Sequence, residues 1–175
     1  NHVRKGGFYG HQLTPKGNTR SNPPVVWVPH NEVGNSPSEP ILVPNGTFKG
    51  QMLYGDVTHG GVNRLFIEKV NGVYQGCILR FSQGIEAGVN RLAWGPDGAL
   101  YLGGIGSNGN WNHNNTRYGL QRLVPTGEKT FEMLKVESAA TGFKVTFTDR
   151  VAEVTDVQVT RWRYDPKELY GGPKL

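Results

Sequence analysis

The chain has 175 residues, with 25 Gly, 11 Pro, a net charge of +5 and a single cysteine, Cys77. Glycine and proline destabilise helix interiors, and one cysteine excludes both an internal disulfide and a cysteine-based zinc site. The basic residues are scattered and lie near acidic ones, which disfavours a nucleic-acid groove, and no apolar run is long enough for a membrane span. The composition therefore predicts an all-β chain of short strands and tight turns.

The first forty residues are expected to be mainly loop. Residues 1–24 are polar and rich in Gly, Asn and Pro, and a short strand is expected at Val25–Pro29. A second polar loop covers His30–Pro40. Loops of this length in compact domains are commonly functional or disordered.

From Ile41 the chain alternates between strand-like runs and turns. Asn71-Gly72 separates two such runs and is the strongest short-range signal for a hairpin. Gly95–Gly98 predicts a second hairpin turn. The expected strands are Ile41–Val43, Met52–Asp56, Asn63–Val70, Val73–Phe81, Asn90–Trp94, Ala99–Gly103 and Tyr118–Val124.

The pattern changes after Phe131. Phe143, Val145 and Phe147 alternate with polar residues, which is typical of a half-buried strand. Leu134–Val136 suggests a strand before it, and Val157–Tyr164 one after it. Strands at this spacing favour the start of a small β-sandwich module.

A short internal repeat is also present. Gly61–Leu65 reads Gly-Val-Asn-Arg-Leu and recurs as Gly88–Leu92, 27 residues later. This offset is shorter than the ~40–50 residues of common propeller repeats. The repeat suggests equivalent strand starts in neighbouring blades, although five residues can also match by chance.

Several segments together resemble a known family. The segments occur in the order Gly7–His11, Pro23–Pro29, Phe48–Asp56 and Trp94–Tyr101. They resemble the later blades of glucose/sorbosone dehydrogenase-like β-propellers of the soluble quinoprotein type, as found in large secreted multidomain bacterial proteins. The resemblance implies an all-β fragment of a longer extracellular or periplasmic protein. It would comprise a partial β-propeller of about two blades over residues 1–126 and an incomplete Ig-like β-sandwich module over residues 130–175.

The same resemblance implies oxidation of a carbohydrate or polyol with pyrroloquinoline quinone and calcium. It also implies partners: the remaining blades and neighbouring domains, such as a cytochrome c or haem-binding domain. Where the family holds the quinone with cations, this chain has Thr58-His59 and Gly88–Asn90, with Arg91 displaced by one position. We therefore expect part of an oxidoreductase-like protein without a complete catalytic set. The alternative is a non-catalytic propeller module that binds carbohydrate or docks other domains.

Two loops carry candidate site residues. His30, Asn31 and Glu32 would supply a base or contacts to sugar hydroxyls. Asp56, Thr58 and His59 precede Gly60-Gly61, a pair that permits close backbone approach to a ligand. Asp56 near His59 would orient the imidazole as a general base. The alternative is that both histidines are hydrogen-bonded loop residues.

The remaining candidates are two arginines and a tryptophan. Arg64 and Arg91 could each clamp an anion or sugar, or form a salt bridge between blades. Trp111 could stack on a sugar ring or cap a turn, whereas Trp94 and Trp162 are expected in the core. Asp56 and His59 with Glu32 or His30 match no standard metal-ligand spacing, so no metal site is predicted.

Overall fold

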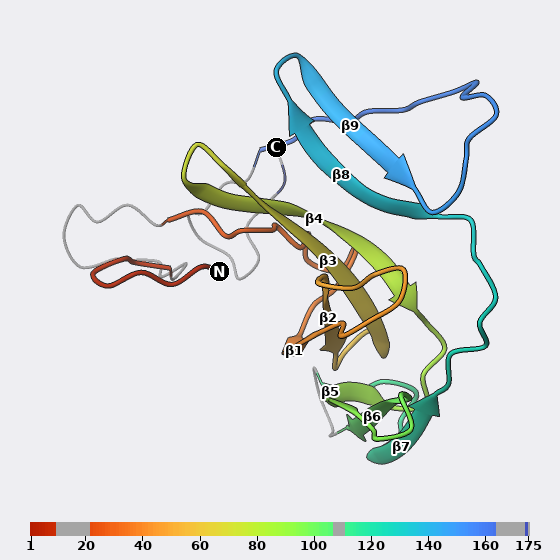
Figure 1. Cartoon of the computed structure of the whole chain (residues 1–175). Helices are drawn as coiled ribbons and strands as arrows, with labels where there is room; N and C mark the ends of the chain where they lie inside the picture. The colour runs from red at the N-terminus through yellow and green to blue at the C-terminus, as the bar shows by residue number, and fades with distance from the viewer. Residues whose placement is uncertain (10–21, 107–110, 164–173, 175) are drawn as a thin grey trace.

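The computed structural model describes residues 1–9, 22–106, 111–163 and 174. These residues form nine strands and no helix, which confirms the all-β expectation (Figure 1). The strands make three antiparallel sheets of four, three and two strands, each a simple meander in chain order. No helix long and apolar enough to cross a membrane occurs in the described part of the chain.

The first sheet has the order β1-β2-β3-β4. Its strands are β1 (Pro37–Leu42), β2 (Met52–Asp56), β3 (Gly61–Val70) and β4 (Val73–Ser82). Asn71 and Gly72 both have positive φ, 48° and 83°, between β3 and β4. Two successive positive φ angles define the type I′ turn, so the hairpin expected from this dipeptide is confirmed.

β1 corrects the expectation that His30–Pro40 is all loop. It starts at Pro37 and includes Pro40, and its pairing with β2 shifts register between these two prolines. Proline cannot donate to a sheet, but β1 lies at the sheet edge, where one row of donors needs no partner strand. The strand expected at Val25–Pro29 is absent, since Val25 and Val26 form a bend and the next three residues have no regular secondary structure.

The second sheet contains β5 (Gly88–Trp94), β6 (Leu100–Ile105) and β7 (Tyr118–Leu123). The turn between β5 and β6 is closed by a hydrogen bond from Gly98 N to Gly95 O of 3.0 Å. Gly98 has a φ of 76°, a conformation that glycine adopts without strain. The second expected hairpin is therefore also confirmed.

The third sheet has only two strands, β8 (Met133–Ala139) and β9 (Gly142–Phe147). Residues 151–163 contain no strand, so the described part of the strand expected at Val157–Tyr164 is absent. Val157 and Val159 are exposed there, because alternation makes a strand only when a partner supplies the hydrogen bonds. Tyr164, like Gly10-His11, lies outside the described residues.

The core lies between the first and second sheets. β5 packs against β1 and β2, and a Cβ on Gly55 would clash with Val89, so glycine permits this close approach. Trp94 is half-buried against the core, and its Nε1 donates to Leu42 O at 2.8 Å. Trp162 and Cys77 are only half-buried. The buried core residues are Val43, Leu53, Val62, Ile85, Val89, Leu92, Leu100 and Leu102.

The two hairpin glycines give a matched stability test. Gly72→Ala should lower the free energy of unfolding by about 1 kcal/mol, because alanine is strained at positive φ. Gly142 has no positive φ, and a Cβ at either position would meet nothing within 4 Å. Gly142→Ala should therefore leave stability unchanged in chemical denaturation. Equal effects of the two substitutions would contradict the turn assignment.

Candidate functional site

The carboxylate of Asp56, at the end of β2, joins two loops. Asp56 is fully buried. Its Oδ2 accepts hydrogen bonds from the backbone N–H of Asn35 at 2.8 Å and of Ser36 at 3.1 Å. Its Oδ1 accepts from the backbone N–H of Thr58 at 3.0 Å and of His59 at 2.8 Å. One side chain therefore holds the loop before β1 against the loop after β2.

A glycine and a pair of hydroxyls tighten this junction. A Cβ on Gly34 would lie 2.6 Å from Asp56 Oδ2, so only glycine lets the loop approach the carboxylate. Ser36 Oγ and Thr58 Oγ1 are 3.0 Å apart and form a second link between the loops. The two candidate segments proposed from the sequence, 30–32 and 56–59, are thus carried on adjoining loops.

The first loop has a local polar network. Asn31 adopts a φ of 62°, and its Oδ1 accepts a hydrogen bond from Asn35 Nδ2 at 2.7 Å. His30 Nδ1 lies 3.5 Å from Asn31 Nδ2. The same side chains that the sequence marked as polar candidates therefore also shape the loop that presents them.

Glu32 binds the cationic side chains of Lys174 and Arg80, and it makes none of the hydrogen bonds to Asp56 that join the two loops. Both carboxylate oxygens of Glu32 accept from Lys174 Nζ, at 3.1 and 2.9 Å, and its backbone O accepts from Arg80 Nη2 at 3.0 Å. Glu32 is exposed, so the ion pair is screened by solvent.

A third loop contributes His113, which the sequence reasoning missed. His113 Nδ1 lies 3.3 Å from Thr58 O, and its ring is so close to Gly60 that a Cβ there would clash with it. Gly60 also has a φ of 61°. The glycine pair does permit close approach, by the His113 imidazole at Gly60 and by the Gln83 side chain at Gly61, and approach of a ligand stays a prediction.

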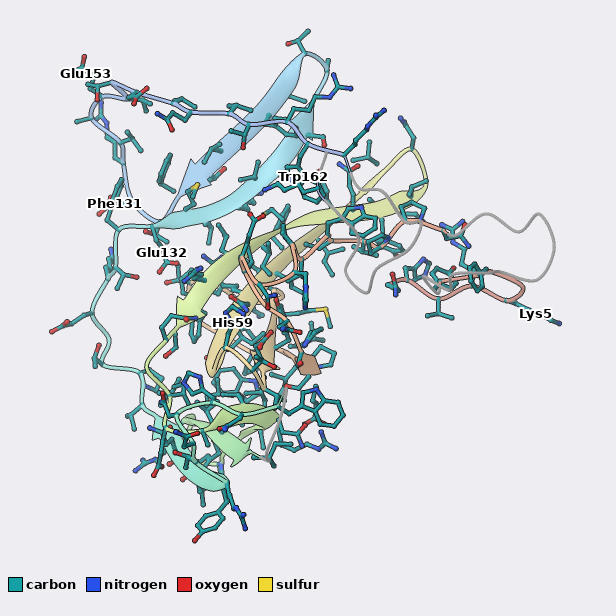
Figure 2. All side chains as sticks on the ribbon, turned by 180° about the vertical axis from the view of Figure 1, so that it is seen from behind. Lys5, His59, Phe131, Glu132, Glu153 and Trp162 are labelled. Carbon is teal, nitrogen blue, oxygen red and sulfur yellow. The ribbon has the colours of Figure 1, made fainter. Side chains whose placement is uncertain are left out.

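These three segments, 30–36, 56–60 and 111–116, form the loop cluster. Trp111 belongs to the third segment and is 58% exposed, two residues from His113. Figure 2 places His59 among the strands and loops of the first sheet. Among the described residues, no three His, Cys, Asp or Glu side chains are grouped to hold a metal ion.

The hydrogen bonds define what Asp56 does here. Its four donors are main-chain groups, so the carboxylate organises the loops, and pairing with the His59 ring stays a prediction. Burial and then the Asp56 charge raise the pKa of the Tyr54 hydroxyl above its ordinary value. That hydroxyl stays protonated and accepts from Asn63 Nδ2 at 3.1 Å.

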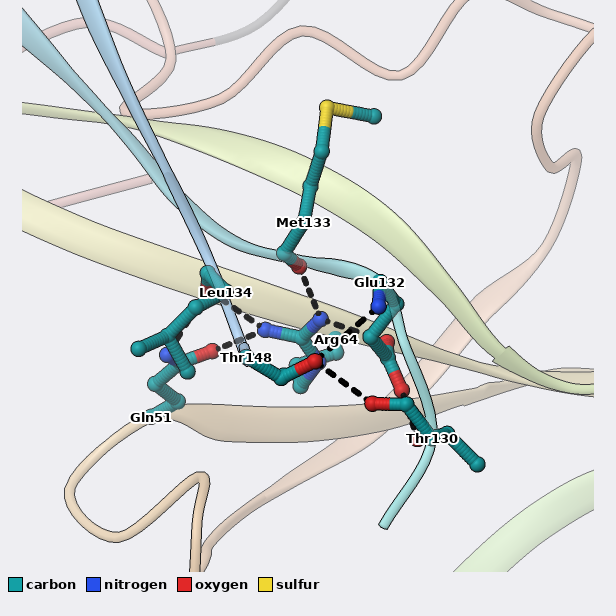
Figure 3. Close-up of polar contacts among 7 residues, drawn as sticks. All are labelled: Gln51, Arg64, Thr130, Glu132, Met133, Leu134 and Thr148. Carbon is teal, nitrogen blue, oxygen red and sulfur yellow. Dashed lines mark hydrogen bonds and ion pairs between the residues drawn. The ribbon is translucent and has the colours of Figure 1, made fainter. Parts of the chain in front are cut away.

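Arg64 lies away from the loop cluster, between the first sheet and the segment that leads to β8 (Figure 3). Its Nη1 donates to Gln51 Oε1 at 2.6 Å and to Leu134 O at 2.8 Å. Its Nη2 donates to Met133 O at 2.8 Å and forms an ion pair with Glu132 Oε2 at 2.9 Å. The Arg64 side chain is fully buried and forms a salt bridge, but its partner Glu132 lies on the connection before β8 and not in the second sheet, so the expected salt bridge between blades is not what Arg64 makes.

Arg91 has the opposite placement. In the β5–β6 pairing, Val89 is opposite Gly104 and Arg91 is opposite Gly103, so Asn90 is an extra, bulged residue. A bulge of one residue turns the following side chains to the other face. Val89 is buried, and Arg91 is exposed on the far side of the sheet.

Comparisons with known proteins identify no relative: no family model matches the sequence, and neither the curated proteins nor the solved structures contain a match.

The Arg64 contacts predict a large stability effect. Arg64→Met should lower the free energy of unfolding by about 3 kcal/mol, because it leaves the Glu132 carboxylate and two carbonyls without their donor. Arg122 and Asp97 form an ion pair of 2.8 Å in which both side chains are partly exposed. Arg122→Met should therefore cost less than about 1 kcal/mol. Comparable losses in thermal denaturation would show that burial of Arg64 is unimportant.

The Asp56 junction gives a second prediction. Asp56→Asn should lower the free energy of unfolding by about 2 kcal/mol, because one amide oxygen cannot accept all four N–H groups. Hydrogen exchange should accelerate at the amides of Asn35, Ser36, Thr58 and His59. Asp149 accepts from one exposed N–H, that of Arg150, so Asp149→Asn should change stability by less than about 0.5 kcal/mol. Unchanged exchange at those four amides would refute the assigned role.

Proposed function

We propose that the chain is part of a sugar-dehydrogenase-like β-propeller whose loop cluster contacts a carbohydrate or polyol. Two antiparallel meanders packed face to face, the first with four strands, support this architecture because propeller blades are four-stranded sheets arranged in this way. Binding residues of such scaffolds are carried on loops. The ordered segments of the sequence that resemble this family support the same proposal.

The observation that carries the proposal is the joining of three polar loops around Asp56 and His113. It places an exposed indole, Trp111, on the same cluster as the exposed amide of Asn31. An aromatic face can pack on the apolar face of a sugar ring, and an amide can donate to and accept from hydroxyls. The cluster therefore has the two kinds of group that a sugar needs.

The cofactor implied by the resemblance does not fit these residues. Where that family has cations for the quinone carboxylates, this chain has Thr58 and His59, and the Thr58 and His59 backbones bind Asp56. Arg64 is buried against Glu132, and Arg91 lies on the far face of β5. We derive no catalytic step through pyrroloquinoline quinone or calcium.

This misfit favours the second candidate function, a non-catalytic module that binds carbohydrate or docks other domains. Asp56 is occupied by four main-chain donors, which leaves it no lone pair in ideal geometry for an imidazole partner. Binding without oxidation requires only the exposed groups of the loop cluster.

Calorimetric titration of the full chain with a panel of sugars and polyols tests the binding. Trp111→Ala should weaken binding roughly tenfold, and Trp111→Phe should retain most of it, since the stacking surface is kept. Phe143 is an even more exposed aromatic on β9, and Phe143→Ala should leave binding unchanged. A panel without any binding ligand would contradict carbohydrate and polyol binding by the loop cluster, and would leave docking of other domains as the remaining candidate.

Dye reduction separates the two candidates. The chain is incubated with pyrroloquinoline quinone, calcium, an artificial electron acceptor and any sugar that binds. We expect sugar binding without dye reduction, because the cationic positions for the quinone are not filled. Reduction that depends on both sugar and quinone would instead establish the oxidoreductase.

A further inference from the structure

The dipeptide Asn-Gly occurs at two described places that are matched in their surroundings. Asn45-Gly46 lies in a bend between β1 and β2, and Asn71-Gly72 forms the turn between β3 and β4. The residues of both pairs are exposed, and a Cβ on either glycine would meet nothing within 4 Å. The remaining Asn-Gly pair of the sequence, Asn108-Gly109, lies outside the described residues.

An asparagine that precedes glycine can react with its own main chain. The backbone N of the glycine attacks Cγ of the asparagine, and the absence of a glycine side chain leaves this approach unhindered. Ammonia leaves, and a succinimide ring forms. Water then opens the ring at one of its two carbonyls, which gives aspartate or isoaspartate. The net reaction consumes water and releases ammonia, and it needs no oxidant or cofactor.

The type I′ turn holds Asn71 in a conformation that opposes this attack. Asn71 has a φ of 48°. In the left-handed region the N of the following residue lies nearly opposite Cβ across the Cα–C bond, so Gly72 N is held away from Asn71 Cγ. Val70 and Val73 pair directly on the two sides of the turn. The attack on Asn71 therefore requires the hairpin to open.

Asn45 is not held in this way. Its φ is not positive, and in both ordinary backbone regions the N of the following residue lies nearer to Cβ. The bend is closed only at its ends, where Val43 N donates to Gln51 O and Gly50 N donates to Val43 O, each at 2.9 Å. Among the described residues, neither the Asn45 side chain nor the Gly46 N–H forms a hydrogen bond. Both reacting groups are therefore accessible in the folded chain.

We propose that Asn45 is a site of spontaneous deamidation in the folded chain, whereas Asn71 is protected by its turn. The two pairs share sequence, exposure and open space, so the backbone conformation makes the difference. Asn45 lies outside the loop cluster, and this inference does not depend on sugar binding.

The position of Asn45 gives the modification a structural consequence. Phe48 belongs to the same bend and covers the Arg64 guanidinium, with 4.1 Å from Cζ to the ring centroid. Gln51, at the end of the bend, accepts from Arg64 Nη1 at 2.6 Å. Isoaspartate adds a carbon to the main chain inside the bend and should loosen this cover. Aspartate changes only the charge.

Peptide mapping of the full chain tests the proposal. The chain is incubated in a mildly alkaline buffer, which favours loss of the proton from the attacking N–H, and mass spectrometry follows each Asn-Gly pair. Asn45 should convert at least about tenfold faster than Asn71, because Asn71 reacts only from the fraction of molecules in which the hairpin is open. In denaturant the two asparagines should convert at similar rates.

Three outcomes would overturn the proposal. They are conversion of Asn71 as fast as that of Asn45 in the folded chain, no conversion of Asn45, and a rate difference that persists in denaturant. Asn45→Gln should abolish conversion at this position, because glutamine would need a larger ring, and should leave conversion of Asn71 unchanged.

Hydrogen exchange tests the structural consequence. The aspartate and isoaspartate forms at Asn45 are separated by chromatography from the unmodified chain. Exchange at the Gly50 amide should be several-fold faster in the isoaspartate form and unchanged in the aspartate form. Equal exchange in all three forms would refute the loosening of the bend. Sugar affinity should be the same in all three forms, so failure of this inference is distinguished from failure of the proposed function.

Discussion

The buried guanidinium of Arg64 is the constraint on which the arrangement of the sheets depends. A buried cation must keep its partners, because separating them leaves an uncompensated charge away from water. Arg64 donates to Gln51, beside the first sheet, and to the segment Glu132–Leu134. If the start of β8 moved away from the first sheet, the buried guanidinium would lose most of its acceptors, so the two stay together. Phe48 covers the guanidinium from one side, with 4.1 Å from Cζ to the ring centroid.

A second polar tie holds the third sheet further along. Glu68 Oε1 accepts from Gln75 Nε2 at 2.8 Å and from Ser138 N at 2.9 Å. The hydrogen bond from Gln75 and then that from Ser138 lower the pKa of Glu68. Glu68 is half-buried, and its hydrogen bond from Ser138 N holds β8 beside the β3–β4 hairpin (Figure 1), whereas Arg64 is fully buried.

The repeated pentapeptide shows how one extra residue in a strand changes the face of the sheet from which an arginine side chain projects. In β3, Gly55 pairs with Val62 and Leu53 with Arg64, so the strand is regular and Arg64 stays on the buried face with Val62. In β5, the extra residue is Asn90, and Arg91 turns away from Val89. The prediction that both copies begin a strand is confirmed, since β3 starts at Gly61 and β5 at Gly88. Their equivalence in two blades stays a prediction.

Local features could be read from the sequence: the all-β class, eight of the nine strand positions to within three residues, and the turn at Asn71-Gly72. They could be read because alternation and positive φ depend on neighbouring residues alone. The sequence also identified Asp56 and the loops at residues 30–32 and 56–61 as carriers of candidate site residues. Three contacts could be known from the folded chain alone: Asp56 binds four backbone N–H groups, His113 packs on Gly60, and Arg64 pairs with Glu132. These contacts join residues far apart in the chain, and the face on which an arginine emerges depends on a bulge that the pentapeptide does not encode.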